Sequence, residues 1–106
     1  MFKDMNTTQA KARAAILKAV AHPTRVLMLH ALSRGDRCVN DLRVLANVCQ
    51  PTITHHLEKL KKVGLVTERR AGKRKIHHLA CPCILEALDC TLGVLQAVKA
   101  RQAKAV

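Results

Sequence analysis

Apolar residues recur with helical spacing over most of the chain, and with the alternation of strands over one short stretch. Proline and glycine mark the boundaries, because Pro fits the first turn of a helix and Gly ends one. The pattern predicts helices at about residues 7–21, from 23 to the Arg34-Gly35-Asp36 stop, at 39–46, 50–63 and 83–101, and strands at 65–70 and 74–79.

Several local signals refine these predicted elements. Thr7 or Thr8 can cap the first helix. Asn47 tolerates the left-handed conformation that a tight turn between the third and fourth helices needs. Gly72 supplies the turn of the hairpin. The predicted buried stripe of the second helix consists of Val26, Leu27, Leu29 and Leu32.

The last predicted helix carries two apolar stripes, one of large and one of small side chains. A helix with apolar residues on two faces can bury one of them against a second copy of the chain. This pattern predicts a homodimer joined through the first and last helices. The two stripes are Ile84, Leu88, Leu92, Leu95 and Val98, and Cys83, Ala87, Cys90, Val94 and Ala97.

Two short helices joined by a tight turn and followed by a hairpin are typical of a winged helix-turn-helix. The predicted fold is therefore mainly α with a small β-hairpin wing. Its five helices come in the order α-α-α-α-β-β-α. We expect residues 1–106 to form a single DNA-binding domain with dimerising terminal helices.

The composition narrows the functional class. The chain has 106 residues, 49% of them apolar, and a net charge of +12, so nucleic acid is the leading partner. It contains neither a run of about 18 apolar residues nor the apolar core of a signal peptide, so we expect a cytoplasmic protein without membrane contact. No acid–base pair, phosphate-binding glycine loop or Cys-x-x-Cys motif indicates an enzyme.

The fourth predicted helix and the hairpin carry the candidate DNA contacts. The first residues of a recognition helix read base edges in the major groove, and cations further along bind phosphates. His56 lies beside an inward Leu and is interpreted as structural, while His77 and His78 are interpreted as ordinary strand residues. The predicted contacts with double-stranded DNA are Gln50, Thr52, Thr54, His55, Lys59, Arg69, Arg70, Lys73, Arg74 and Lys75.

The cysteines offer a second chemistry. Cys81, Cys83 and Cys90 supply three soft thiolates, which suit a thiophilic ion such as As(III), with Sb, Cd or Pb as further candidates. Cys83 and Cys90 are separated by about 10 Å along a regular helix, so either the first turn unwinds or the partner chain supplies Cys90. Cys38 is interpreted as buried scaffold, and Cys49 as a weak cap of the recognition helix.

Four segments carry a resemblance to a known family: HPTR at 22–25, DRCVNDL at 36–42, QPTITHHL at 50–57 and the Arg/Lys-Gly wing. They resemble the corresponding segments of the ArsR/SmtB repressors. The resemblance implies a homodimer formed by the first and last helices, an operator, and release from DNA by an inducer. The metalloid box of that family usually has Cys-x-Cys, whereas this chain has Cys38 followed by Asn40 in the second position. The zinc site of that family is also incomplete in this chain. Val94 and Ala97 occupy the approximate positions of the two ligands that the last helix of the partner would supply.

The favoured hypothesis is a dimeric repressor that a thiophilic metalloid or metal ion, As(III) or Sb(III) first, releases from its operator. One alternative keeps the fold but senses thiol oxidation or reactive sulfur through two of the cysteines. Another is an architectural DNA-binding protein without an inducer.

Overall fold

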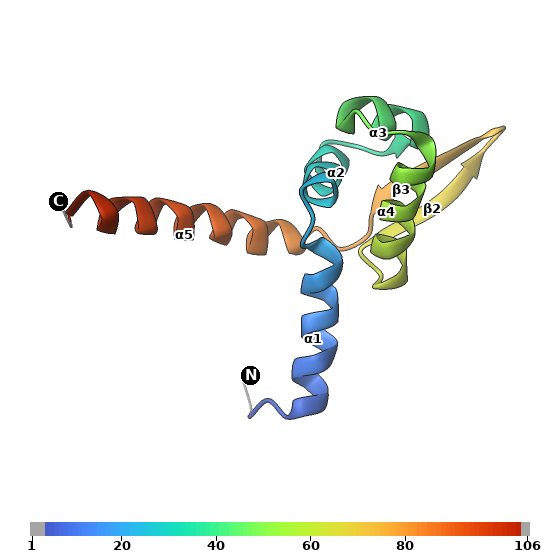
Figure 1. Ribbon diagram of the computed structural model, residues 1–106. Coiled ribbons are helices and arrows are strands. Elements are labelled where there is room, and N and C mark those ends of the chain that lie inside the picture. Colours follow the sequence, from blue (N-terminus) through green and yellow to red (C-terminus); the bar gives the residue numbers. More distant parts are fainter. Residues whose placement is uncertain (1–3, 105–106) are drawn as a thin grey trace.

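The structure is a computed structural model that describes residues 4–104, and Figure 1 shows the arrangement of its elements. The fold is the predicted winged helix-turn-helix with five helices. The elements are α1 (Thr7–Val20), α2 (Pro23–Ser33), β1 (Arg37–Cys38), α3 (Val39–Ala46), α4 (Gln50–Lys62), β2 (Val66–Ala71), β3 (Arg74–Leu79) and α5 (Ile84–Lys104).

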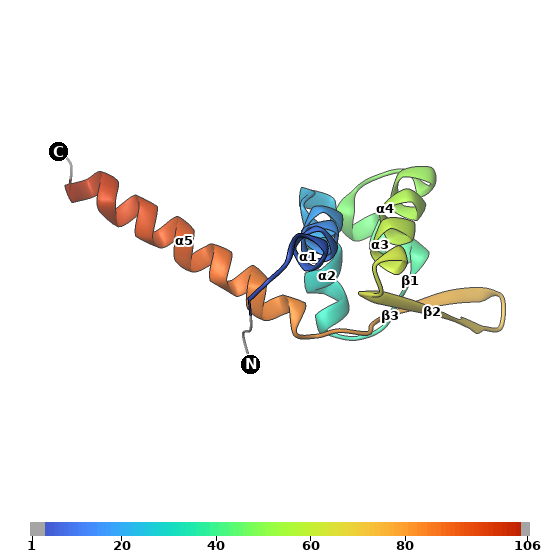
Figure 2. The same ribbon diagram turned by 90° about the horizontal axis from the view of Figure 1, so that it is seen from below.

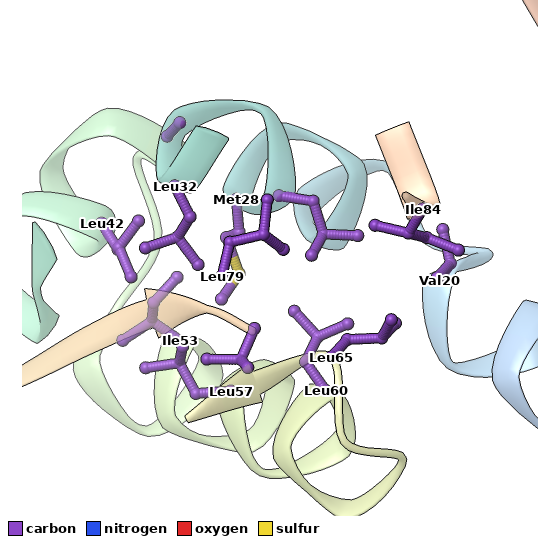
Figure 3. Close-up of a cluster of buried hydrophobic side chains, with 13 residues drawn as sticks. Val20, Met28, Leu32, Leu42, Ile53, Leu57, Leu60, Leu65, Leu79 and Ile84 are labelled. Carbon is purple, nitrogen blue, oxygen red and sulfur yellow. The ribbon is translucent and has the colours of Figure 1, made fainter. Parts of the chain in front are cut away.

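One hydrophobic core joins all five helices to the β2–β3 hairpin. Leu42, Ile53 and Leu60 are fully buried at the contacts between α3, α4 and the hairpin, as Figure 3 shows. This core holds the inner face of α4, so the opposite face of the helix lies on the surface of the molecule. The other buried members are Val20, Met28, Leu29, Ala31, Leu32, Leu57, Leu65, Val66, Leu79 and Ile84.

The buried face of α2 differs from the prediction. Val26 is 37% exposed and Leu27 is 49% exposed, so these two members of the predicted stripe were wrong. Leu29 and Leu32 are buried as expected, together with Met28 and Ala31. Residues 26–29 are all apolar, so helical spacing alone could not decide which side of α2 turns inward.

The wing belongs to a sheet of three antiparallel strands in the order β1-β3-β2. The predicted hairpin is confirmed, and Gly72 adopts a φ of 64° in its turn. The predicted element order lacked β1, in which Arg37 and Cys38 pair with His77 and Ile76 of β3. Two residues are too short for an alternating pattern, so only the pairing reveals this strand.

Turns and caps set the ends of the helices. Asn47 has φ 54° and ψ 51°, which confirms the left-handed turn between α3 and α4. The cap of α1 is Asn6, in a capping box with Gln9, and neither Thr7 nor Thr8. The Asn6 side chain accepts from the Gln9 N–H at 2.8 Å, so the threonines lie inside the first turn.

Helices α1 and α5 project from the body in different directions (Figures 1 and 2). Only Ile84 of α5 is buried, and Leu92, Leu95 and Val94 of the two predicted stripes are exposed. Ile16 and Leu17 of α1 are also exposed. Within one chain, the apolar faces of these helices therefore remain uncovered. None of the described helices is long and apolar enough to cross a membrane.

Candidate nucleic-acid interface

One stripe of α4 faces away from the core. Gln50, Thr54, His55 and Lys59 are exposed on it, in agreement with the helical spacing of the predicted contacts. The sequence analysis did not include Glu58, which lies on the same stripe. Side chains on this face are free to meet another molecule, since Ile53 and Leu57 hold the opposite face in the core.

Thr52, another predicted contact, lies beside this stripe and is half-buried. Its Oγ1 is 3.1 Å from Sγ of Cys49, which is the N-cap residue of α4. That hydrogen bond is the main cause of the lowered pKa of the exposed Cys49 thiol. The hydroxyl of Thr52 is thus already engaged, so we expect its role in base reading to be smaller than that of Thr54.

A cleft of about 440 Å³ separates α3 and α4 from the wing. Gln50, Thr54 and Glu58 line it from α4, and Arg43 lines it from α3. The wing contributes the predicted phosphate contacts Arg70, Lys73, Arg74 and Lys75. The side chains predicted to read bases and a group of cations therefore face the same concave surface, an arrangement that suits contact with a polyanion.

Arg69 and Arg70 point to different sides of the hairpin. Arg70 lines the cleft, whereas Arg69 donates from Nη2 to Oδ2 of Asp36 at 3.1 Å. Oδ1 of Asp36 lies 2.7 Å from Nδ1 of His78. The hydrogen bonds from His78 and Arg69 lower the pKa of Asp36. Asp36 thus ties the loop after α2 to the wing and already pairs Arg69 with a carboxylate.

A second acidic residue ties α4 to the wing. Oε1 of Glu68 accepts from Lys61 Nζ at 2.9 Å and lies 3.1 Å from His77 Nε2. Lys61 Nζ is also 2.7 Å from Glu58 Oε1, and the two carboxylates raise its pKa. The hydrogen bond from Lys61 is the main cause of the lowered pKa of Glu68. Lys61 therefore connects α4 to the wing, although it lies only two residues after the predicted phosphate contact Lys59.

His56 and His77 are the two buried polar residues of the described chain. His56 is 5% exposed and its Nδ1 accepts from Arg25 Nε at 3.0 Å, which confirms a structural position. His77 is 1% exposed and faces Glu68. Burial is the main cause of the lowered pKa of each ring, and the hydrogen bond to Glu68 partly opposes it at His77. Burial therefore favours the neutral form of both rings in the folded protein.

These two histidines predict destabilisation by mild acid. Below their ordinary pKa of 6.5, the histidines bind protons more readily in the unfolded chain than in the folded chain. The free energy of unfolding therefore decreases as the pH is lowered below about 6.5. We expect a lower midpoint of urea unfolding at pH 5.5 than at pH 7.5, measured at one protein concentration. Asp36 and Glu68 contribute only nearer their ordinary values of 3.8 and 4.5.

The variant His77→Gln is the control for this prediction. Its amide can still donate to Glu68 but cannot titrate, so the loss between pH 7.5 and 5.5 should shrink. An equal midpoint at both pH values in the parent would contradict the prediction.

The candidate thiolate ligands lie where the wing passes into α5. Cys81 is half-buried and its Sγ donates to the Gly64 carbonyl at 3.5 Å, while Cys83 and Cys90 are exposed. Ile84 N–H donates to Cys81 O at 3.2 Å, which starts the helix immediately after the Cys-Pro-Cys segment. Within residues 4–104 of one chain, no three His, Cys, Asp or Glu side chains converge as metal ligands. The donor type suits a soft ion, but a three-thiolate site needs a further rearrangement or a second chain.

The positions of the two remaining cysteines agree with their interpretation, although the Cys49 side chain makes no capping hydrogen bond. Cys38 is buried at the N-cap of α3, and Cys49 is the N-cap of α4. Sequence reasoning missed Asn40 and Asp41, which line the cleft from α3, and the acidic ties at Asp36 and Glu68. Asp36 lies 33 residues before Arg69 along the chain, and no local pattern reports a contact over such a separation.

Comparison with known sequences gives one consistent family. Residues 22–68 match the profile described as "Bacterial regulatory protein, arsR family". The chain is 36% identical to the HTH-type transcriptional repressor SmtB of Mycobacterium tuberculosis over 65% of this chain and 51% of that protein. It is 34% identical to the HTH-type transcriptional regulator NmtR of the same species over 77% of this chain and 69% of that protein. The chain is 36% identical to the arsenical resistance operon repressor of Staphylococcus xylosus, over 65% of this chain and 66% of that protein. The chain thus spans about half the length of the SmtB relative.

Solved structures show the same architecture. The M. tuberculosis protein Rv0081 superimposes with a TM-score of 0.79 at 29% identity, over 93% of this chain and 99% of that one. The antimony-specific transcriptional repressor AntR gives a TM-score of 0.76 at 25% identity, over 92% and 89%. The homodimeric winged helix-turn-helix domain of Mb0332 from Mycobacterium bovis gives 0.65 at 25% identity, over 100% and 96%.

Proposed function

Because this chain belongs to the arsR family of bacterial regulatory proteins, we propose that it is a homodimeric transcriptional repressor that binds an operator in double-stranded DNA. The observation that carries this proposal is the cleft between α4 and the wing. Gln50 and Thr54 face it from one side and Arg70, Lys73 and Arg74 from the other. The helix would read bases in the major groove while the wing cations bind the adjacent backbone.

The proposed dimer uses α1 and α5, with residues 1–106 acting as one domain. Exposed Ile16 and Leu17 on α1 and Leu92 and Leu95 on α5 support it, because apolar faces of this length are normally covered. The solved relative Mb0332 is described as homodimeric. Two copies would present two recognition helices to half-sites ~34 Å apart, one turn of DNA.

We further propose that a thiophilic ion releases the repressor, with As(III) or Sb(III) favoured and Cd or Pb as alternatives. Cys81, Cys83 and Cys90 would hold it, since three thiolates match the preference of these soft ions. The relatives include an arsenical resistance repressor and an antimony-specific one. Cys83 and Cys90 are exposed, so Cys90 of a second chain can reach the site if α5 pairs with its copy. Closing the site would then change the α5 contact and the spacing of the two α4 helices.

A thiol-redox or reactive-sulfur input is the second candidate. The exposed Cys49, whose pKa is lowered by Thr52, supports it. Oxidation of this thiol would add bulk and polarity at the first turn of α4, where base contacts are expected. The two inputs differ in which cysteines they need, so substitution separates them.

The experiment combines operator selection with inducer titration. DNA that binds the protein is selected from a random library, and release is followed with arsenite, antimonite, cadmium, zinc and persulfide. We expect arsenite or antimonite to release the protein, and the variants Cys81→Ser, Cys83→Ser and Cys90→Ser to lose that response. Cys38→Ser and Cys49→Ser are matched controls that should still respond.

Three outcomes would contradict parts of this proposal. Loss of the arsenite response in Cys38→Ser alone would move the sensor to α3. Release by persulfide only, abolished in Cys49→Ser, would favour the redox input. Failure to select any preferred sequence would leave an architectural DNA-binding role and contradict the repressor.

A further inference from the structure

One guanidinium connects the last turn of α1 to the middle of α4. Arg25, in the first turn of α2, donates from Nε to Nδ1 of His56 on α4 at 3.0 Å. Its Nη1 donates to the backbone carbonyl of Ala19 on α1, also at 3.0 Å. Both bonds are part-buried, and they span 31 and 6 residues along the chain.

The acceptor on α4 is held in one protonation state. His56 Nδ1 accepts a hydrogen bond, so a neutral ring carries its proton on Nε2. The ring is 5% exposed and lies against His22, with the ring centroids 4.3 Å apart. His22 is itself fixed as the N-cap of α2, where its Nδ1 accepts from the Thr24 N–H at 3.1 Å. His56 is therefore a fixed, neutral acceptor for Arg25.

The buried packing of helix α1 is confined to its last turn. Of its residues, only Ala19 and Val20, both in the last turn, are buried. Apolar packing of this kind is not directional, whereas two hydrogen bonds from one planar guanidinium fix an angle. Arg25 donates to the carbonyl of Ala19, one of these two residues. It therefore contacts α1 at the turn that fixes the direction of the helix.

We propose that Arg25 is a positioning residue that fixes α4 relative to α1 and thereby sets the half-site spacing that the dimer accepts. The inference rests on the proposed function, in which α1 forms part of the dimer and α4 reads DNA. Arg25 need not touch DNA for this role. Losing the link should loosen the orientation of each α4 in the dimer while leaving its base-reading side chains in place.

The test uses a matched pair of variants at the buried ring. His56→Asn keeps an acceptor where Nδ1 now lies, whereas His56→Leu places a methyl group there. Affinities are measured for a single half-site and for palindromes whose half-sites are moved apart or together by one and two base pairs. The DNA sequence is first selected with the unaltered protein, so a failure to find any operator would count against the proposed function instead of this inference.

We expect His56→Leu to bind the single half-site within about twofold of the parent while its preference for the best spacing falls about tenfold. His56→Asn should retain most of that preference. Arg25→Lys should behave like His56→Leu, because one ammonium cannot replace the two-pronged contact. Unchanged spacing preference in His56→Leu, or an equal loss on half-site and palindromes, would overturn the positioning role.

A measurement on the unaltered protein keeps the proposal open to refutation even if a variant fails to fold. Two-bond ¹H–¹⁵N spectra report which ring nitrogen of a histidine carries the proton. We expect a neutral His56 ring protonated at Nε2 in the protein, both free and bound to DNA. A ring protonated at Nδ1 cannot accept from Arg25 and would overturn the link.

Discussion

Replacing Leu95 with Glu in α5 is expected to make the protein monomeric and to abolish operator binding at concentrations where the parent binds fully. Leu95 is 66% exposed in the single chain, so its loss should leave the fold of the monomer intact. In the proposed dimer, both copies of Leu95, one from each chain, are buried at the interface. Each lost Leu contact removes about 2 kcal/mol, and each buried carboxylate adds a comparable penalty.

Counted over both chains, these contributions total about 8 kcal/mol, which would weaken the dimer by roughly 10⁵- to 10⁶-fold. Sedimentation velocity over a concentration series measures the dimer, and circular dichroism checks the fold. Gln96→Glu is the matched control, since it introduces the same charge at the next position, which belongs to neither apolar stripe of α5. A Leu95→Glu protein that sediments as a dimer would show that this face is not the interface.

Arg70→Ala is expected to weaken operator binding by ten- to a hundredfold, whereas Arg69→Ala should have a much smaller effect. The two arginines are neighbours, but Arg70 lines the cleft and Arg69 is paired with Asp36 on the other side of the wing. A phosphate contact contributes about 0.9 to the slope of log K against log salt concentration. Losing Arg70 from both chains should reduce the slope by about 2, from a parent value set by roughly 6–10 phosphate contacts.

Fluorescence anisotropy at several salt concentrations measures both the affinity and the slope. Arg69→Ala serves as the control, because it removes the same charge from the adjacent position of the same strand. Equal losses for the two variants would mean that net charge dominates over the position of the side chain. A larger loss for Arg69→Ala would place the DNA on the other side of the wing.

Local chemistry made most of the fold predictable from the sequence. Pro23 and Pro51 fit the first turns of α2 and α4, where a missing N–H costs little, and Gly64 follows α4 with a φ of 84° that glycine adopts readily. Each predicted boundary agrees with the structure to within a few residues. Asn47 and Gly72 occupy left-handed turns for a similar reason. Such signals act within a few residues and need no knowledge of the tertiary structure.

Features that depend on distant contacts were not predictable. β1 exists because two residues pair with β3, and the inner face of α2 is decided by what packs against it. The pairing of Arg69 with Asp36 and of Lys61 with Glu68 was not predictable for the same reason, since these carboxylates approach the two cations only in the folded chain. In the candidate interface, residue type predicted which side chains can meet DNA, and only the fold distinguishes those that already have a partner.

The hydrogen bond from the Cys81 thiol to the Gly64 carbonyl links the cysteine segment before α5 to the turn after α4. In the proposed ion complex, Cys81 would bind as a thiolate, so it would lose the proton that makes this bond and could no longer donate to the Gly64 carbonyl. The end of α4 would then favour a different position. If the ion weakens DNA binding in this way, linkage requires the effect to be reciprocal: DNA that holds α4 in place would raise the dissociation constant of the ion by the same factor by which the ion raises that of DNA.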